Sequence, residues 1–213
     1  LKMEGALRRA IDSGEGLTLH YQPQVNTRSA SVGSAEALLR WNHPEHGALS
    51  PALYLPLAEG LGLMPALGDW VLRQACSDLA ALRAEGILLE HVSVNVSPLQ
   101  LREGFAERVA VILEESGIPS NALVLELTEG VLIENDAAAL SQIVALAAMG
   151  VELAIDDFGT GYSSLSYLTR FPLGELKIDR SFITNVTQDA QQQELVRAII
   201  AMARALAMHV VVA

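Results

Sequence analysis

The stretch VELAIDDFGTG, residues 151–161, places two adjacent carboxylates at the end of an apolar run. The run from Val151 to Ile155 predicts a buried strand, and the glycines after Asp156 and Asp157 predict a tight turn. Adjacent acids at the end of a buried strand are costly unless a cation or hydrogen bonds compensate them. Their oxygen ligands suit Mg2+, Mn2+ or Ca2+. From this stretch alone, a metal site and a loop with two solvated aspartates are equally good interpretations.

Outward from this segment, the chain alternates strand patterns with helix patterns. Strands are predicted at Leu17–Asn26, Val32–Trp41, His91–Ser97, Ala122–Glu129, Val151–Phe158, Glu175–Asp179 and His209–Ala213. Helices are predicted at Pro51–Gly86 with an interruption near Gly60–Pro65, at Leu99–Gly117, Asn135–Gly150 and Asp189–Ala207, with a short helical turn at Ser163–Phe171. The turn-rich connection from Asn26 to Ser31 is so short that the first two strands are expected to form a hairpin.

After the hairpin, the alternation predicts parallel strands joined by crossover helices. Seven strands are predicted, and a closed (β/α)8 barrel of the TIM type needs eight. The alternative is an open, doubly wound sheet, which would concentrate its ligand groups at one switch point. We favour the barrel because polar residues occur near the C-terminal ends of many different strands.

These polar residues are predicted to face the barrel interior at its C-terminal mouth, where barrels of this type place their chemistry. They are Glu36, Asn95, Glu126, Asp156, Asp157 and Lys177. Four carboxylates, one amide and one lysine form a donor set for one or two hard cations, which can activate a water and stabilise a phosphoryl transition state. Lys177 stands out because the only other lysine is Lys2, and a lysine can position or deprotonate water as arginine cannot.

Each of these residues also has a purely structural explanation. Glu36 could be a charge at the rim, Asn95 a satisfied core amide, and Lys177 a salt bridge that closes the barrel mouth. Glu129 could be a solvated carboxylate at a helix start. The functional interpretation therefore depends on their joint position at successive strand ends.

Composition narrows the function classes. The 213 residues are 51% hydrophobic, which suffices for one good-sized core, and the net charge of −11 argues against a DNA or RNA surface. Cys76 is the single cysteine, sits in a helical pattern and fits a reducing compartment. We predict no bilayer-spanning run and no signal peptide. The chain begins with Leu1 rather than Met, so we expect it to be a piece of a longer protein.

The sequence resembles the EAL-domain cyclic-di-GMP phosphodiesterases over essentially its whole length. The motifs that carry the resemblance are Tyr21-Gln22-Pro23, Glu36-Ala37-Leu38 continuing as Leu39-Arg40-Trp41, Val94-Asn95-Val96-Ser97, Glu126-Leu127-Thr128-Glu129, Asp156-Asp157-Phe158-Gly159-Thr160-Gly161-Tyr162-Ser163-Ser164 and Leu176-Lys177-Ile178-Asp179. The resemblance implies a modified (β/α)8 barrel whose first strand is antiparallel. It also implies hydrolysis of cyclic-di-GMP to linear pGpG with Mg2+ or Mn2+ at a two-metal site, and inhibition by Ca2+.

The resemblance also assigns roles to individual residues. Metal ligands would be Glu36, Asn95, Glu126 and Asp156, with Asp157 as a ligand of the second metal. Lys177 would hold or activate the nucleophilic water, and Gln22, Leu38 and Arg40 would contact the substrate. Glu129, counted with Lys177 and Glu36 as catalytic, would steady the loop from Phe158 to Ser164, which in the family links metal occupancy to dimerisation.

Two departures from the family pattern are visible. Gly174 stands where the family often has Asp, with a mild local effect expected. The family continues the strand at Ala213 with a Glu-Gly-Val-Glu pattern that supplies a further metal ligand. We therefore expect residues 1–213 to form an EAL domain truncated before its last strand and helix, with weak or no catalysis by itself.

The resemblance leaves a second function open, a cyclic-di-GMP receptor that binds without hydrolysis. Degenerate members usually lose the Glu of the EAL motif or the paired Asp, and this chain keeps Glu36, Asp156 and Asp157. A homodimer, fusion to sensor or GGDEF-type domains and a cytoplasmic location are further expectations, the last including the cytoplasmic part of a membrane-bound sensor.

Overall fold

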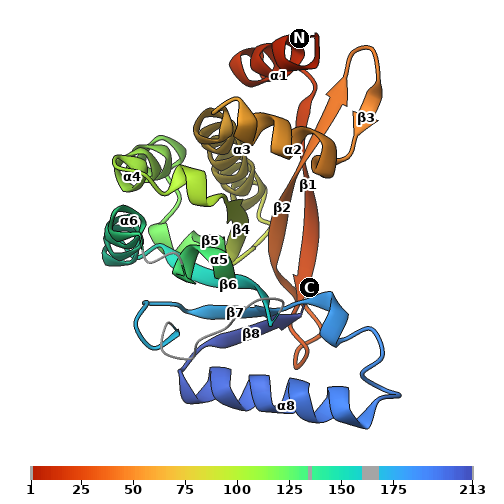
Figure 1. Cartoon of the computed structure of the whole chain (residues 1–213). Helices are drawn as coiled ribbons and strands as arrows, with labels where there is room; N and C mark the ends of the chain where they lie inside the picture. The colour runs from red at the N-terminus through yellow and green to blue at the C-terminus, as the bar shows by residue number, and fades with distance from the viewer. Residues whose placement is uncertain (1, 134–135, 160–167, 213) are drawn as a thin grey trace.

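A computed structural model describes residues 2–133, 136–159 and 168–212 of the chain. In chain order its elements are α1 (Lys2–Ser13), β1 (Leu17–Val25), β2 (Val32–His43), β3 (Gly47–Leu49), α2 (Pro51–Gly60), α3 (Met64–Ala84), β4 (His91–Val96), η1 (Pro98–Gln100), α4 (Phe105–Ser116), η2 (Ser120–Ala122), β5 (Leu123–Thr128), α5 (Glu129–Ile133), α6 (Ala137–Ala148), β6 (Glu152–Phe158), β7 (Glu175–Ile178), η3 (Arg180–Phe182), α8 (Ala190–Ala205) and β8 (His209–Val212) (Figure 1).

The strands form one curled sheet in the order β1-β2-β4-β5-β6-β7-β8, with β3 paired to β2. β1 and β2 are antiparallel, and every pair from β2–β4 to β7–β8 is parallel. Helices α3, α4 and α6 lie along one face of the sheet, and α8 covers β7 and β8 (Figure 1). The predicted α/β class and the antiparallel first strand of a barrel-like fold are confirmed. Among the described residues, β1 and β8 are the two ends of the sheet.

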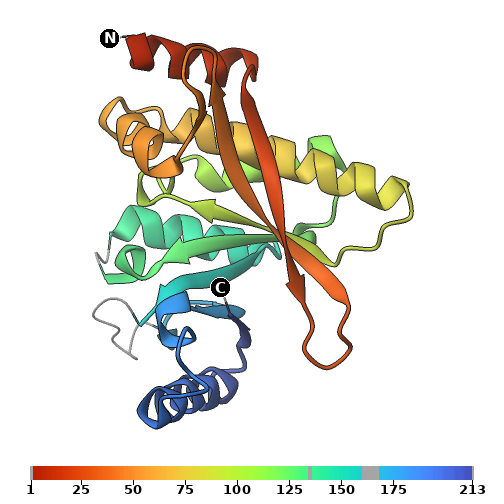
Figure 2. The same ribbon diagram turned by 90° about the vertical axis from the view of Figure 1, so that its right-hand side faces the viewer.

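The first hairpin is longer than the strands beside it. Residues 34–37 of β2 pair with β4, whereas Leu38 to His43 continue beyond the last β2–β4 pair and contact only β1 and β3 in the sheet. Figure 2 shows the resulting β1–β2 ribbon as a twisted hairpin that extends past the other strands. We call the sheet face that carries Glu36 the inner face and the face covered by helices the outer face.

Side chains on the outer face supply most of the core. Val92, Val94 and Val96 of β4 are at most 3% exposed and pack with the helices that follow the parallel strands. A smaller cluster lies between the extended part of the ribbon and α1 and α2, where Trp41 packs edge-on against Tyr54. Burying each large apolar side chain stabilises the fold by about 1.5–3 kcal/mol. The two clusters fix which face of each strand is left for polar groups.

The structure corrects several predicted boundaries. The predicted set of seven strands omits β3, which is only three residues long and begins at Gly47, where φ is 68°. The helix predicted at Leu99–Gly117 begins at Phe105 instead. Before it, the Oγ of Ser97 accepts from the N–H of Leu99, and the Oε1 of Gln100 accepts from the N–H of Ser97. These two bonds close a 3-10 turn, which the apolar pattern alone cannot distinguish from helix.

Two further predictions have limited outcomes. The helical turn expected at Ser163–Phe171 falls largely outside the described residues. Within the described ranges, no helix has the length and apolar character that crossing a bilayer requires.

Candidate functional site

Three carboxylates from three strands meet on the inner face. Glu36 of β2, Glu126 of β5 and Asp156 of β6 each offer an oxygen that lies within 4.8 Å of the other two. They meet because Glu36 pairs with Ser93 of β4, and Asn95, two residues further along β4, pairs with Glu126. Neighbouring parallel strands thus present inward-facing acids near their C-terminal ends, as the sequence pattern predicted.

Lys177 of β7 lies among these carboxylates. Its Nζ is 2.6 Å from Oε2 of Glu126, 3.0 Å from Oε2 of Glu36 and 3.3 Å from Oδ2 of Asp156. The lysine is only 2% exposed and Glu126 is 1% exposed. The salt-bridge interpretation of Lys177 therefore holds in this structure, and it places the ammonium group beside every carboxylate of the cluster.

Burial and neighbouring charges together set the pKa values of Glu126 and Lys177. Burial raises the pKa of Glu126 to about 8, and the nearby charges of Glu36 and Asp156 add to the effect while Lys177 opposes it. For Lys177 burial disfavours the charged form, but the carboxylates of Glu126, Asp156 and Glu36 outweigh it and raise the lysine pKa. The Glu126 carboxylate is therefore costly to ionise without a cation close by.

The donor set fits a hard divalent cation on two observations. Three carboxyl groups face one ammonium group, so once Glu126 gives up its proton, two negative charges at the cluster have no partner of opposite sign. In addition, Oε1 of Glu126 is buried without a hydrogen-bond partner among the described residues. Carboxylate oxygens are the ligands that Mg2+, Mn2+ and Ca2+ prefer.

Asn95 extends the cluster. Its Nδ2 donates a hydrogen bond of 2.7 Å to Oε1 of Glu36. It shares the inner face of β4 with Ser93, while the valines between them are buried on the outer face. The amide therefore orients the Glu36 carboxylate, and it carries an oxygen that would serve as a further donor.

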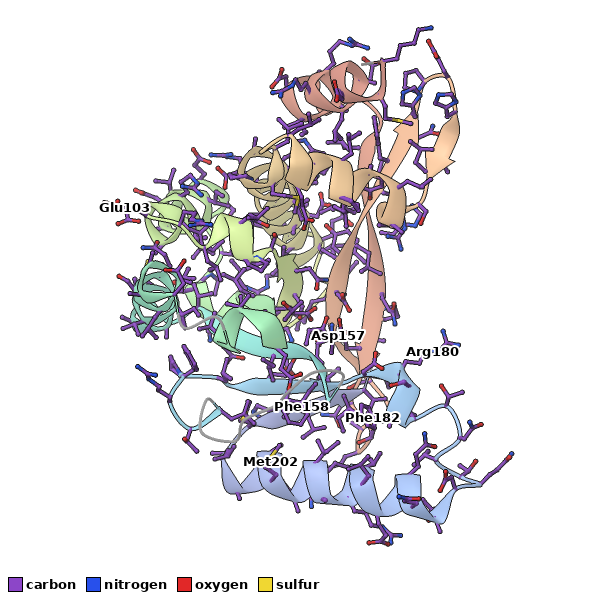
Figure 3. All side chains as sticks on the ribbon, in the orientation of Figure 1. Glu103, Asp157, Phe158, Arg180, Phe182 and Met202 are labelled. Carbon is purple, nitrogen blue, oxygen red and sulfur yellow. The ribbon has the colours of Figure 1, made fainter. Side chains whose placement is uncertain are left out.

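Asp157 lies beside the cluster because the end of β6 is irregular. Its φ is 54°, in the left-handed region that residues other than glycine seldom adopt, and the β6–β7 register shifts between Ile155 and Phe158. Its N–H donates to Oδ1 of Asp156 at 2.9 Å. Burial, followed by the charge of Asp156, raises the pKa of its carboxyl group. Figure 3 shows Asp157 and Phe158 where β6 ends, with Phe182 of η3 nearby.

Glu129 is the first residue of α5, directly after β5. It is 7% exposed, so its interpretation as a solvated carboxylate at a helix start is wrong. It is not one of the three carboxylates that gather around Lys177. Its role in steadying the following loop stays a prediction, because residues 160–167 lie outside the described part of the chain.

Gln22, Leu38 and Arg40 lie on the ribbon next to the cluster. Gln22 pairs with Glu36 across the β1–β2 hairpin, and Leu38 and Arg40 follow Glu36 at every second position on the same face. Nη1 of Arg40 donates to the carbonyl of Leu39 at 2.8 Å. The structure thus groups the three predicted substrate contacts beside the acids, although contact with a substrate stays a prediction.

The groups that hold this ribbon in place could not be predicted from the sequence. The hydroxyl of Tyr21 donates to Oδ2 of Asp78 in α3 at 2.5 Å, and Oδ1 of Asp78 accepts from Gln74 at 2.7 Å. The hydroxyl of Tyr54 donates to the same Leu39 carbonyl that Arg40 contacts. The only signal in the sequence was that Asp78 follows Gln74 by four positions on a predicted helix. That spacing does not identify Tyr21, 57 residues away, as the partner of Asp78.

Comparisons with known proteins show which family this chain resembles. The sequence model of the EAL domain matches residues 4–213. The chain is 43% identical over 212 residues to the cyclic di-GMP phosphodiesterase NbdA of Pseudomonas aeruginosa, covering 99% of the chain and 27% of NbdA. It is 40% identical over 212 residues to the cyclic di-GMP phosphodiesterase PdeR of Escherichia coli, covering 99% of the chain and 32% of PdeR.

A solved structure shows the same fold. The PaMucR phosphodiesterase in complex with c-di-GMP superposes with a TM-score of 0.90 at 41% identity, covering 99% of this chain and 85% of that one. The curated relatives are longer proteins, since the chain spans 27% of NbdA, 30% of MucR and 32% of PdeR.

Proposed function

Because the chain belongs to the EAL domain family, we propose that it is a metal-dependent phosphodiesterase that hydrolyses cyclic-di-GMP to linear pGpG in bacterial second-messenger signalling. The observation that carries the proposal is the group of Glu36, Glu126 and Asp156 around Lys177. Two relatives at 40% identity or more over nearly the whole chain are cyclic di-GMP phosphodiesterases by name.

Glu36, Glu126 and Asp156 would hold the first cation, with Asn95 as a further donor and Asp157 directed toward a second one. Mg2+ or Mn2+ bound there would lower the pKa of a water and neutralise the charge that develops on the phosphoryl oxygens. Ca2+ has the same oxygen ligands but accepts looser coordination, so we propose that it occupies the site and inhibits turnover.

The protein's own residues would do the rest. Lys177, whose pKa is raised, stays protonated at neutral pH and holds the attacking water by donating a hydrogen bond. The water oxygen forms a bond to phosphorus and gives up a proton to solvent, while the bond from phosphorus to the 3′ oxygen breaks and that oxygen takes up a proton from solvent. The product pGpG then leaves with a 5′ phosphate and a free 3′ hydroxyl. Gln22, Leu38 and Arg40 would position the nucleotide along the ribbon.

The relatives also suggest which domains accompany this one. One relative is a bifunctional diguanylate cyclase and phosphodiesterase, MucR of Pseudomonas aeruginosa, and another is the oxygen sensor protein DosP of Escherichia coli. We propose by analogy that this domain works beside a sensor or GGDEF-type domain, acts in the cytoplasm and dimerises. A mass measurement in solution, with and without Mg2+, tests the dimer.

Incubation of the purified native protein with cyclic-di-GMP and Mg2+ tests the activity, with pGpG quantified by chromatography. We expect turnover that EDTA abolishes, that Mn2+ supports and that Ca2+ inhibits. Glu126→Gln should reduce kcat by at least a hundredfold, because it removes a buried anionic donor without changing its volume. Glu152→Gln, at the opposite end of β6, is the matched control and should leave kcat unchanged.

Two results would count against the proposal. Binding of cyclic-di-GMP without any linear product, under all three metal conditions, would make the domain a receptor. Turnover by the Glu126→Gln variant at the wild-type rate would remove the carboxylate cluster from the mechanism.

A further inference from the structure

The two faces of the β1–β2 ribbon are fixed by independent contacts. On the outer face, Tyr21 donates to Asp78 of α3, and Leu39 packs in the cluster with α1 and α2. On the inner face, Glu36 is bonded to Asn95 and Lys177. Because side chains alternate along a strand, His20 lies on the inner face, opposite to Tyr21.

His20 is directly across the hairpin from Leu38. The register pairs Gln22 with Glu36, then His20 with Leu38. The second pair is two residues further along the strand, about 7 Å beyond the carboxylate cluster. Directly opposed side chains on one face have Cβ atoms about 4.5–5.5 Å apart. The imidazole and the leucine side chain therefore form adjoining parts of one surface above the metal ligands.

The two side chains differ in exposure in a way that suits a bound base. His20 is exposed, whereas Leu38 is only partly so. Among the described residues, no hydrogen bond or ion pair holds the imidazole of His20, so its ring can turn toward a ligand. A second histidine near this end of the ribbon, His46, instead packs its ring 4.6 Å from that of His43. His20 is thus the imidazole on this ribbon that faces the site.

We propose that His20 stacks on one guanine of the bound dinucleotide and so determines the preference for a purine phosphodiester. This inference rests on the proposed function, because it assumes that a phosphodiester lies at Glu36, Glu126 and Asp156. A nucleoside attached to that phosphate reaches the His20–Leu38 pair, where Leu38 gives an apolar surface and His20 a flat aromatic ring. Proteins commonly hold unpaired bases by stacking them on aromatic side chains, histidine included.

His20 would act through binding rather than through the chemical step, since it lies away from the scissile bond. Base–aromatic stacking corresponds to a change in affinity of about fivefold to a hundredfold. We therefore expect His20→Ala to raise KM and the Kd for cyclic-di-GMP by at least about fivefold while kcat stays within twofold.

The test compares four variants of the native protein. Affinity for cyclic-di-GMP is measured by calorimetry with Ca2+, and KM and kcat are measured with Mg2+. His20→Phe keeps a ring for stacking and should bind within twofold of wild type. His20→Gln keeps a hydrogen-bonding group without a ring and should behave like His20→Ala. His46→Ala removes an imidazole outside the inner face and should leave Kd and KM unchanged.

Three outcomes separate the inference from the proposed function. Wild-type affinity in His20→Ala would overturn the stacking role while leaving the phosphodiesterase assignment intact. Retention of affinity by His20→Gln and its loss in His20→Phe would also overturn it, because a hydrogen bond would then replace stacking. A wild-type protein that neither binds nor cleaves cyclic-di-GMP would overturn the proposed function itself.

Discussion

Replacing Lys177 with methionine is the most direct perturbation of the carboxylate cluster. Lys177 is 2% exposed and is the one cation within 3.3 Å of Glu126, Glu36 and Asp156 in the described part of the chain. Methionine has a similar length and no charge, so the variant keeps the packing and removes the ammonium group. Three carboxylates would then face one another without compensation.

The expected loss of folding stability in Lys177→Met is large. Removing one partner of a buried ion pair typically destabilises a protein by about 3–5 kcal/mol, because a buried charge is left alone. For a chain of this size each kcal/mol shifts the melting temperature by about 2–4 °C, so we expect a decrease of roughly 6–20 °C. Protonation of Glu126, whose pKa burial already raises to about 8, will reduce the cost at low pH. The decrease should therefore be greatest above pH 8.

A divalent cation should restore the variant. Mg2+ would supply the missing positive charge, and a ligand at a hundred times its Kd stabilises the folded state by about 2.7 kcal/mol. We expect Mg2+ to raise the melting temperature of Lys177→Met more than that of the wild type. Thermal and urea unfolding at pH 8.5, with EDTA or with Mg2+, measures both effects. Lys2→Met, at the exposed start of α1, is the matched control and should change neither the melting temperature nor its response to Mg2+.

The same experiment can refute the reasoning. If Lys177→Met in EDTA unfolds within about 1 kcal/mol of the wild type at pH 8.5, the carboxylates are not a buried charged cluster that needs compensation. Equal stabilisation of both proteins by Mg2+ would show that the lysine and the cation do not compensate the same charges.

Three further substitutions test other parts of the structure. Burial raises the pKa of Glu175 to about 7 from 4.5. The folded state therefore keeps the proton of Glu175 between those values, and its stability falls as pH rises through this window. In urea unfolding, Glu175→Gln should be up to about 3 kcal/mol more stable than the wild type at pH 8 and similar to it at pH 5. Gly159→Ala should cost more than Gly62→Ala in the same assay, because both have a positive φ but only at Gly159 would a Cβ lie 2.7 Å from the ring of Phe182; equal costs would show that the ring moves freely. Tyr21→Phe should lower stability by about 1.5–3 kcal/mol through loss of a hydrogen bond to a carboxylate, and an unchanged urea midpoint would contradict this.

Much of the fold could be predicted from the sequence because its signals are local and periodic. The alternation of valines with Ser93 and Asn95 assigns both faces of β4, and the short connection after β1 requires an antiparallel hairpin. The boundaries that failed are set by single hydrogen bonds or by very short elements. β3 is too short to show a period, and the turn at Ser97 depends on two side-chain bonds that no pattern displays.

The candidate site was predictable in composition but not in its detailed contacts. The alternation of side-chain direction along parallel strands suffices to bring Glu36, Glu126 and Asp156 to one face. The same alternation does not predict the position of Asp157, because a register shift and a positive φ alter the direction of the strand end there. Contacts such as Tyr21 to Asp78 join residues 57 positions apart, so they depend on how the helix settles against the ribbon.

The charge balance of the cluster links folding to the proposed chemistry. Three carboxyl groups share one ammonium group, and ionisation of all three leaves two negative charges that a divalent cation would compensate. If Lys177 were a fourth carboxylate or a neutral residue, folding would depend on the cation, as in small domains built around a structural metal. If a second lysine faced the same acids, the attraction for a divalent cation would largely be lost. A single buried lysine therefore suits a cation that binds a preformed fold and exchanges, as the proposed catalytic metal would.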